Sequence, residues 1–140
     1  MLPYCANAYA SEDDEKTLRA LLRTAGKVEK LDETLMDAAS ALSGCGPAFV
    51  CVFLEALADA GVSCGLTRAA ATEYAAQTVL GTAKLVLETG EHPAALKDAV
   101  CSPGGSTIAG VCALEESGFR AAAEKAVLAA FARTKALADA

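Results

Sequence analysis

Two predicted helices in this chain of 140 residues carry apolar side chains on nearly every side, which restricts the folds open to it. The first extends from Pro47 to about Val62, and the second forms the later half of a helix that begins after Thr67. A helix that is apolar all round is buried between other helices or against another chain. One small domain offers too few helices to cover both, so we predict a dimer interface.

The composition favours closely packed helices. Apolar residues make up 54% of the chain, but aromatic residues only 5%, and alanine is heavily used. From Asp32 onward every periodic pattern is helical, with breaks predicted at 43–47, at the glycines 61 and 65, at 90–93 and at Gly118. The expected helices cover residues 32–42, 47–62, 67–88, 94–100, 106–117 and 119–137. The predicted fold class is therefore all-α, a helical bundle that pairs as a dimer.

Residues 1–31 do not follow this pattern. A short strand or extended lead-in comes first, and Ser11 followed by three acidic residues is a strong signal for the start of a helix. Gly26 ends that helix, and Lys27–Leu31 alternates as a short edge strand does. The unit lacks a glycine-rich phosphate loop, and we expect no parallel partner strand in it. We interpret 1–31 as the remnant of an α/β domain and 32–140 as the helical domain.

Charge and cysteine content exclude several classes of protein. The net charge of −6 and the scattered basic residues argue against a nucleic-acid surface. The six cysteines show no C-x-x-C spacing, and the chain shows no signal peptide, so we expect reduced, buried thiols, no metal site and a cytoplasmic protein. The densest apolar run, Ala48–Leu54, is too short to cross a bilayer, so no membrane segment is predicted.

The stretch Asp98–Gly110 is the candidate binding site. It contains the end of one helix, a Ser-Pro-Gly-Gly break and the start of another helix, which we expect Ser106 or Thr107 to cap. The backbone amides of Gly105, Ser106 and Thr107 would then point out of a helix N-terminus, where a small carboxylate is favoured. An ordinary corner between two helices has the same composition, so spacing alone leaves both interpretations open.

A series of motifs resembles one family, pyrroline-5-carboxylate reductase, in the order in which that family has them. The resemblance covers nearly the whole chain from Asp32, and residues 1–31 fit the last strand–helix–strand of the family's nucleotide-binding domain. The motifs are Ser43-Gly44-Cys45-Gly46-Pro47-Ala48, Glu55-Ala56-Leu57-Ala58-Asp59-Ala60-Gly61, Ala75-Ala76-Gln77-Thr78-Val79-Leu80-Gly81, His92-Pro93, Leu96-Lys97-Asp98, Ser102-Pro103-Gly104-Gly105-Ser106-Thr107-Ile108, Leu114-Glu115 and Gly118-Phe119-Arg120.

The resemblance implies a two-domain enzyme of proline biosynthesis. An N-terminal Rossmann domain would bind NADPH or NADH, and a C-terminal helical domain would interlock into a homodimer. Hydride would pass to the imine carbon of pyrroline-5-carboxylate and give L-proline. By the same resemblance the turn binds this small-molecule substrate through Ser102, Gly104, Gly105, Ser106 and Thr107. Ser102 and the amides would hold the carboxylate, and the Thr107 hydroxyl would act on the ring nitrogen as hydrogen-bond partner or proton donor, which makes an imine a better hydride acceptor.

The chain departs from the family pattern in two respects. It has no G-x-G-x-x-G motif, so we expect no tight cofactor binding and little or no activity from this chain alone. Cys45 stands where the family usually has serine, and a thiol is a poor hydrogen-bond donor. Two alternatives stay open: a dimerisation module without catalytic role, and a half-enzyme completed by a separate Rossmann partner.

Several other residues have plainer interpretations. The only histidine, His92, precedes a proline, which favours a role at a helix start or on the surface over acid–base chemistry. Lys97 and Asp98 are interpreted as a solvated pair, and Cys101 as a small buried side chain beside the turn. No partner other than a second copy of the chain and the small-molecule substrate is predicted, neither nucleic acid nor membrane.

Overall fold

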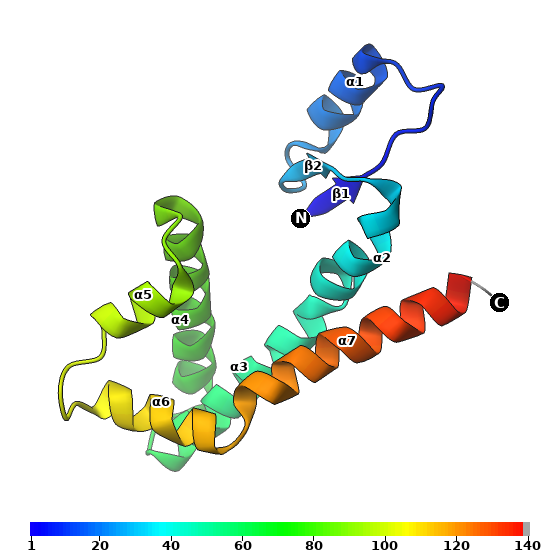
Figure 1. The fold of residues 1–140 in the computed structure, drawn as a ribbon. Coiled ribbons are helices and arrows are strands. Elements are labelled where there is room, and N and C mark those ends of the chain that lie inside the picture. The colour runs from blue at the N-terminus through cyan, green and yellow to red at the C-terminus, as the bar shows by residue number, and fades with distance from the viewer. Residues whose placement is uncertain (139–140) are drawn as a thin grey trace. The chain divides into compact units, whose positions relative to one another are not determined.

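The computed structural model describes residues 1–138, and Figure 1 shows the order of its elements. Contacts divide the chain into two compact units. The first comprises Met1–Pro47 and the chain from Lys125 onward, and the second comprises Ala48–Glu124. The domain boundary predicted after residue 31 stays a prediction, because these units are defined by contacts and not by evolutionary origin.

The first unit begins with a small parallel sheet. Strand β1 (Leu2–Tyr4) leads into helix α1 (Glu12–Leu22), which returns the chain to strand β2 (Val28–Lys30) beside β1. Leu2 pairs with Val28 and Tyr4 with Lys30 in parallel register. The expectation that the unit contains no parallel partner strand is therefore wrong, because α1 provides the crossover that parallel pairing needs. Of the two options for the first residues, a strand or an extended lead-in, the structure has the strand. The predicted helix and second strand are confirmed, but the helix ends at Leu22 and not at Gly26.

Polar contacts hold α1 to this sheet. Tyr4 donates a hydrogen bond from its hydroxyl to Glu15 Oε2 at 2.8 Å, and Arg19 Nε donates to the same hydroxyl at 2.9 Å. Lys30 forms an ion pair with Glu15, whose side chain is only 18% exposed. Hydrogen bonds from Lys30 and from Tyr4 hold the pKa of Glu15 below its usual value. The carboxylate of Glu15 thus joins both strands to the helix.

The expected break at residues 43–47 is wrong. A helical run continues from η1 (Glu33–Leu35) through α2 (Met36–Ala39) and a π-helical turn, η2 (Ser40–Gly44), into α3 (Gly46–Ser63). The amide of Cys45 donates to the carbonyl of Ser40, five residues earlier, at 3.0 Å. Pro47 enters in the first turn of α3, where its missing N–H costs little. The helical run therefore continues past Gly44 through a widened turn, and Pro47 follows that turn without ending the run. Asp32 caps the start of the run, as predicted.

This continuity changes the argument about membranes. Among the described residues one helical run, Glu33–Ser63 with 31 residues, is long and apolar enough to cross a bilayer by length and composition. The prediction of no membrane segment rested on the short run Ala48–Leu54 and on a helix break at 43–47, and the structure has no such break. A core helix of a soluble protein passes the same test, so the result by itself assigns no membrane.

In the second unit, α3 and α4 (Arg68–Thr89) pack at a close corner. Gly61 was expected to help end α3, but it lies inside the helix and faces Ala71. The helix ends at Ser63, and Gly65 with φ +101° turns the chain. Thr67 caps α4 by accepting a hydrogen bond from the Ala70 amide at 3.3 Å, as predicted.

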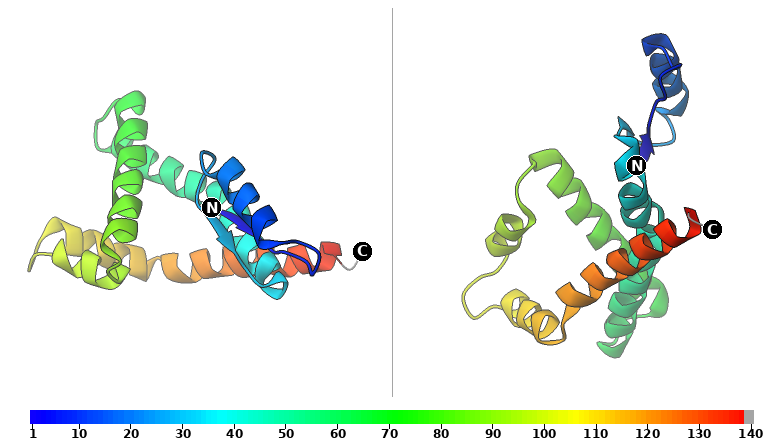
Figure 2. Two further views of the ribbon diagram at one scale, coloured as in Figure 1. Left: turned by 90° about the horizontal axis from the view of Figure 1, so that it is seen from above. Right: turned by 45° about the vertical axis from the view of Figure 1, so that its right-hand side comes forward.

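Three further helices complete the described chain: α5 (Pro93–Ala99), α6 (Ser106–Glu116) and α7 (Phe119–Ala138). Gly118, with φ +74°, makes the corner between α6 and α7. Arg120 spans this corner and donates to Glu115 through Nε and Nη2. Within the second unit, the loop between α5 and α6 lies at the edge in both views of Figure 2.

The structure buries very few side chains. The buried apolar residues are four alanines, and no large side chain among residues 1–138 is fully buried. Large apolar residues of α3 and α4 are exposed instead, including Val52 at 67%, Leu80 at 62% and Leu87 at 80%. Monomeric soluble proteins rarely leave so much apolar surface uncovered. The helices identified from sequence as apolar all round are thus the ones that lack cover in a single chain.

Candidate functional site at the start of α6

The candidate site is built on a tight turn between α5 and α6. The Gly105 amide donates to the Ser102 carbonyl at 3.0 Å, which closes a four-residue β-turn over Ser102–Gly105. Pro103 occupies the second position, where its fixed φ is favoured, and Gly104 occupies the third with φ +69°. This is the pattern of a type II turn, which requires a positive φ at its third residue. The Pro-Gly pair therefore specifies the turn.

Gly105 and Ser102 lie unusually close together. A Cβ built on Gly105 would collide with Ser102 Oγ and would lie 3.1 Å from the Ser102 carbonyl oxygen. The backbone of Gly105 is extended, with φ −76° and ψ 165°, so its conformation alone does not require glycine. The second glycine of the motif is thus explained by space, whereas the first is explained by its positive φ.

The start of α6 presents unpaired backbone donors. Gly105 is the N-cap and supplies no side-chain cap, so the prediction that Ser106 or Thr107 caps the helix is wrong. The first bond to a helical carbonyl comes from Ala109, which donates to Gly105 O at 3.3 Å. Within residues 1–138 the amides of Ser106, Thr107 and Ile108 have no acceptor.

These three amides make the N-terminus of α6 suited to an anion. The sequence alone predicts this role for Gly105, Ser106 and Thr107. The structure moves the set by one residue, because the Gly105 amide is already used within the turn. The Ile108 amide was missed because the predicted cap was wrong. A helix capped by the side chain of Ser106 or Thr107 would leave a different set of amides without an acceptor. Residue type gives no signal for this shift, because serine and threonine are at least as favourable as glycine at the N-cap.

The Thr107 hydroxyl also differs from the hydroxyls of most threonines in the helices. Five helical threonines donate their hydroxyl to the carbonyl four residues earlier, at 2.8–3.0 Å: Thr17, Thr72, Thr82, Thr89 and Thr134. Thr107 is the second residue of α6, so the carbonyl four residues earlier belongs to Pro103, outside the helix. Its hydroxyl makes no hydrogen bond to the described chain. Ser102 Oγ likewise has no partner there, and both side chains are exposed.

The flanking residues of α5 have structural roles. His92 is the N-cap of α5, where Nδ1 accepts a hydrogen bond from the Ala94 amide at 3.2 Å, which confirms a role at a helix start. Lys97 and Asp98 form a solvated ion pair at 2.6 Å, as predicted, and the hydrogen bond that Lys97 donates to Asp98 raises the pKa of Lys97. Cys101 is partly buried, and its amide donates to the Asp98 carbonyl at 3.1 Å. The expectation of buried thiols is wrong for this chain, because four of the six cysteines are exposed and the other two only partly buried.

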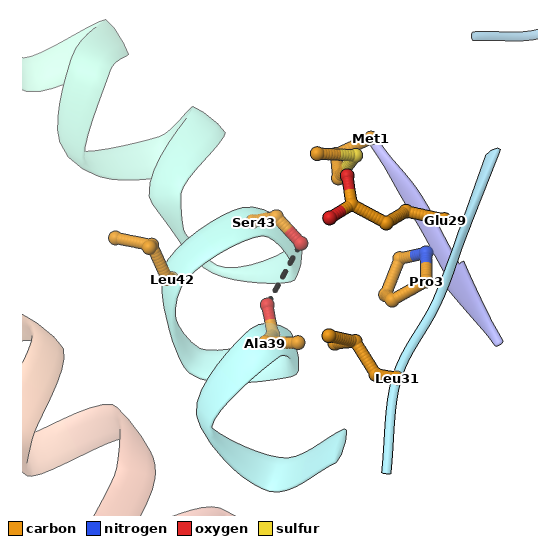
Figure 3. Close-up of a pocket in the computed structure, with 7 residues that line it drawn as sticks. All are labelled: Met1, Pro3, Glu29, Leu31, Ala39, Leu42 and Ser43. Atoms are coloured by element: carbon orange, nitrogen blue, oxygen red, sulfur yellow. Dashed lines mark hydrogen bonds between the residues drawn. The ribbon is translucent and has the colours of Figure 1, made fainter. Parts of the chain in front are cut away.

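A separate cavity in the first unit does not include the turn. It has a volume of about 160 Å³ and lies between the small sheet and the helical run after it (Figure 3). Its lining is Met1, Pro3, Glu29, Leu31, Ala39, Leu42 and Ser43. The Ser43 hydroxyl donates to the Ala39 carbonyl at 2.7 Å and is not available to a ligand. The lining is largely apolar, and its one charged side chain is that of Glu29.

The start of α1 does not fit the pyrophosphate of a dinucleotide. In a Rossmann fold a glycine-rich strand-to-helix turn holds that group at a helix N-terminus. Here Ser11 caps the helix, and four acidic residues fill its first turn, Glu12–Glu15. Hydrogen bonds from the Ser11 side chain and amide lower the pKa of Asp14, so this carboxylate is charged at neutral pH. The negative charge would repel a phosphate, and the capping side chain already occupies the donor.

Comparison with known proteins identifies the family. The family of pyrroline-5-carboxylate reductase dimerisation domains matches residues 33–137. Pyrroline-5-carboxylate reductase of Synechocystis is 50% identical over 137 residues, which cover 98% of this chain and 51% of that protein. The Escherichia coli enzyme is 50% identical over 121 residues, covering 86% of this chain and 45% of that protein. The chain thus spans about half the length of the curated relatives it matches.

Solved structures agree. The Plasmodium falciparum pyrroline carboxylate reductase, solved with NADP bound, superposes with a TM-score of 0.89 at 37% identity and covers 96% of this chain and 54% of that one. The Streptococcus pyogenes enzyme gives 0.86 at 37% identity, covering 93% and 50%. The matched residues include α3, α4 and the complete turn between α5 and α6. The chain therefore belongs to the pyrroline-5-carboxylate reductase family, and its residues 33–137 correspond to that family's dimerisation domain.

Proposed function

We propose that this chain supplies the substrate-binding and dimer-forming half of a pyrroline-5-carboxylate reductase in proline biosynthesis. The observation that carries the proposal is the set of unpaired donors at the start of α6. Three amides and three hydroxyls, from Ser102, Ser106 and Thr107, have no partner in the described chain at a motif that resembles the family's substrate turn. A cyclic imine with a carboxylate matches this set, because it carries one anion and one basic nitrogen.

The amides and the hydroxyls of Ser102 and Thr107 have distinct tasks in this proposal. The amides of Ser106, Thr107 and Ile108, with the Ser102 hydroxyl, hold the carboxylate at the positive end of α6. The Thr107 hydroxyl donates to the ring nitrogen. Donation of a hydrogen bond or proton there withdraws electrons from the C=N bond, and the imine carbon becomes a better hydride acceptor. Gly104 contributes the turn that brings these groups together.

In this proposal the nicotinamide cofactor is not bound at the start of α1, because the acidic residues there repel phosphate. The hydride donor, NADPH or NADH, is bound by a nucleotide-binding domain of the family. We therefore expect the chain alone to be inactive or nearly so. The exposed apolar helices support the second task, self-association into a homodimer, and the family match assigns the same role. With those faces covered by a partner, a soluble cytoplasmic protein without membrane or nucleic-acid contacts is the expected form.

Calorimetric titration with L-proline, the product, tests the substrate site. Thr107→Val keeps the shape of the side chain but removes the hydroxyl, whereas Thr107→Ser keeps the hydroxyl. We expect saturable binding that Thr107→Val weakens and Thr107→Ser largely retains. Thr17→Val is the matched control, since its hydroxyl is bonded to the Asp13 carbonyl within α1. Equal binding by Thr107→Val and wild type would reject the role of the hydroxyl.

A folded, dimeric protein that binds no L-proline would reject a preformed substrate site in this chain. Addition of a purified Rossmann domain from a family member then decides between the two alternatives. Restored reduction of pyrroline-5-carboxylate with NADPH would identify a half-enzyme completed by a separate partner. Continued inactivity in the presence of that domain would leave a dimerisation module without catalytic role.

A further inference from the structure

The two glycines of the turn differ in what makes them necessary. Gly104 has a positive φ, so a side chain there strains the backbone itself. Gly105 has backbone angles that any residue adopts, and yet it is the glycine against which Ser102 Oγ lies. A side chain at 105 would therefore leave the backbone acceptable and displace the Ser102 hydroxyl.

We propose that Gly105 is a positioning residue. Because it has no side chain, it leaves the space that the Ser102 hydroxyl occupies at the start of α6, and its own amide does not contact the substrate. This inference rests on the proposed function, and it changes the role of Gly105 within it. The amide donates to the Ser102 carbonyl at 3.0 Å, so it is not available to a carboxylate. What Gly105 contributes is the space that Ser102 Oγ occupies.

The contacts around Gly105 limit how the turn can respond to a side chain. The three nearest atoms to a built Cβ all belong to Ser102: Oγ, the carbonyl oxygen at 3.1 Å and Cβ at 3.6 Å. The carbonyl is held by the turn hydrogen bond. Oγ is the end of a short side chain with no hydrogen bond to the described residues, so it is the atom that moves. Rotation of χ1 carries the hydroxyl to another rotamer, away from its present place against Gly105.

A double-mutant cycle between Gly105→Ala and Ser102→Ala tests the inference in this chain. Affinity for L-proline is measured by calorimetry for the wild type, both single variants and the double variant. We expect Gly105→Ala to weaken binding at least tenfold in the wild type and less than threefold in the Ser102→Ala background. The contact with the Ser102 carbonyl is present in both backgrounds, so a purely structural effect would give the same loss twice. Equal losses would overturn the inference.

A second measurement does not depend on ligand binding. The Ser102 χ1 rotamer is followed through three-bond couplings to its Hβ protons in the free protein. Gly105→Ala is expected to change this rotamer. The matched control is Gly110→Ala, a glycine inside α6 whose added Cβ would meet nothing within 4 Å, and it should leave the rotamer unchanged.

The two measurements separate the failure of this inference from the failure of the proposed function. If the wild type binds no L-proline, the proposed substrate site fails, while a rotamer change in Gly105→Ala still supports the positioning of Ser102 by Gly105. If the rotamer is the same in Gly105→Ala and wild type, the inference is wrong whether or not L-proline binds.

Discussion

Gly61 in α3 lies directly against Ala71 in α4: a Cβ on Gly61 would come within 3.0 Å of the Ala71 Cβ. Ala71 is only 3% exposed, and Ala58 and Ala75, one turn away on the two helices, are buried as well. Small residues thus let two apolar helices approach closely at one corner. Asp59 and Arg68 form an ion pair at 2.6 Å beside it. The corner sets how α3 and α4 present their remaining apolar faces.

We expect Gly61→Val to destabilise the protein by roughly 1–3 kcal/mol, because a branched side chain overpacks the contact with Ala71. The measurement is urea unfolding followed by circular dichroism. Gly110→Ala serves as control, since it adds a methyl group to open space inside a helix and should stabilise by roughly 0.5–1 kcal/mol. An unchanged unfolding midpoint for Gly61→Val would show that the two helices can separate there at little cost.

The exposed apolar face of α4 is expected to be a dimer contact. Leu80 is 62% exposed in the single chain, and a charge at its place would be buried without a partner in the dimer. Leu80→Glu should therefore weaken self-association at least tenfold, measured by sedimentation equilibrium. Leu21→Glu is the matched control, because Leu21 is 73% exposed but lies in α1, outside the matched family region. A Leu80→Glu protein that stays dimeric would place the interface on other helices.

Gly104→Ala should destabilise the turn between α5 and α6, because φ +69° costs a residue with a Cβ roughly 1–2 kcal/mol. Asparagine tolerates this conformation better, so Gly104→Asn should cost less. Thermal unfolding of both variants gives the comparison. No Cβ contact explains such a loss, since a Cβ on Gly104 would meet nothing within 4 Å. The same melting temperature for Gly104→Ala and Gly104→Asn would contradict an origin in the backbone.

Local chemistry predicted the helix starts well. Ser11, Asp32, Thr67 and His92 each cap a helix in the structure through the side chain. The first three are preferred capping residues in front of a periodic apolar pattern, and His92 precedes a proline. These signals are readable because a cap depends on its own residue and the next three. The apolar helices were also identified correctly, and the family resemblance was confirmed by comparison.

The errors have a common physical origin in contacts that spacing does not reveal. A π-helical turn contains Gly44, and Pro47 follows it in the first turn of α3. The presence of glycine and proline alone cannot distinguish such a widened turn from the end of a helix. Gly61 packs against α4 instead of ending α3. The cap of α6 is Gly105 because Ser102 lies where a side chain would be. The roles of Ser102, Gly104, Gly105, Ser106 and Thr107 toward the substrate stay predictions, and so does the effect of Cys45.

The last prediction concerns Glu15, which joins α1 to both strands. Hydrogen bonds from Lys30 and Tyr4 hold its pKa below the usual 4.5, so the fold favours the ionised carboxylate. The stabilisation is complete above that pH and is lost as the pH falls through the lowered pKa. The pKa of Lys30 is raised above 10.5, so its titration affects stability only in alkaline solution.

The Leu31 amide, which donates to Tyr4 O at 2.8 Å, reports on the sheet through hydrogen exchange. From neutral pH down to about pH 3, the ratio of its protection in wild type to that in Glu15→Gln should fall towards one. Asp13→Asn, which removes an 88% exposed partner of Lys16, should show no such change, and a constant ratio for Glu15→Gln would contradict the role of this carboxylate.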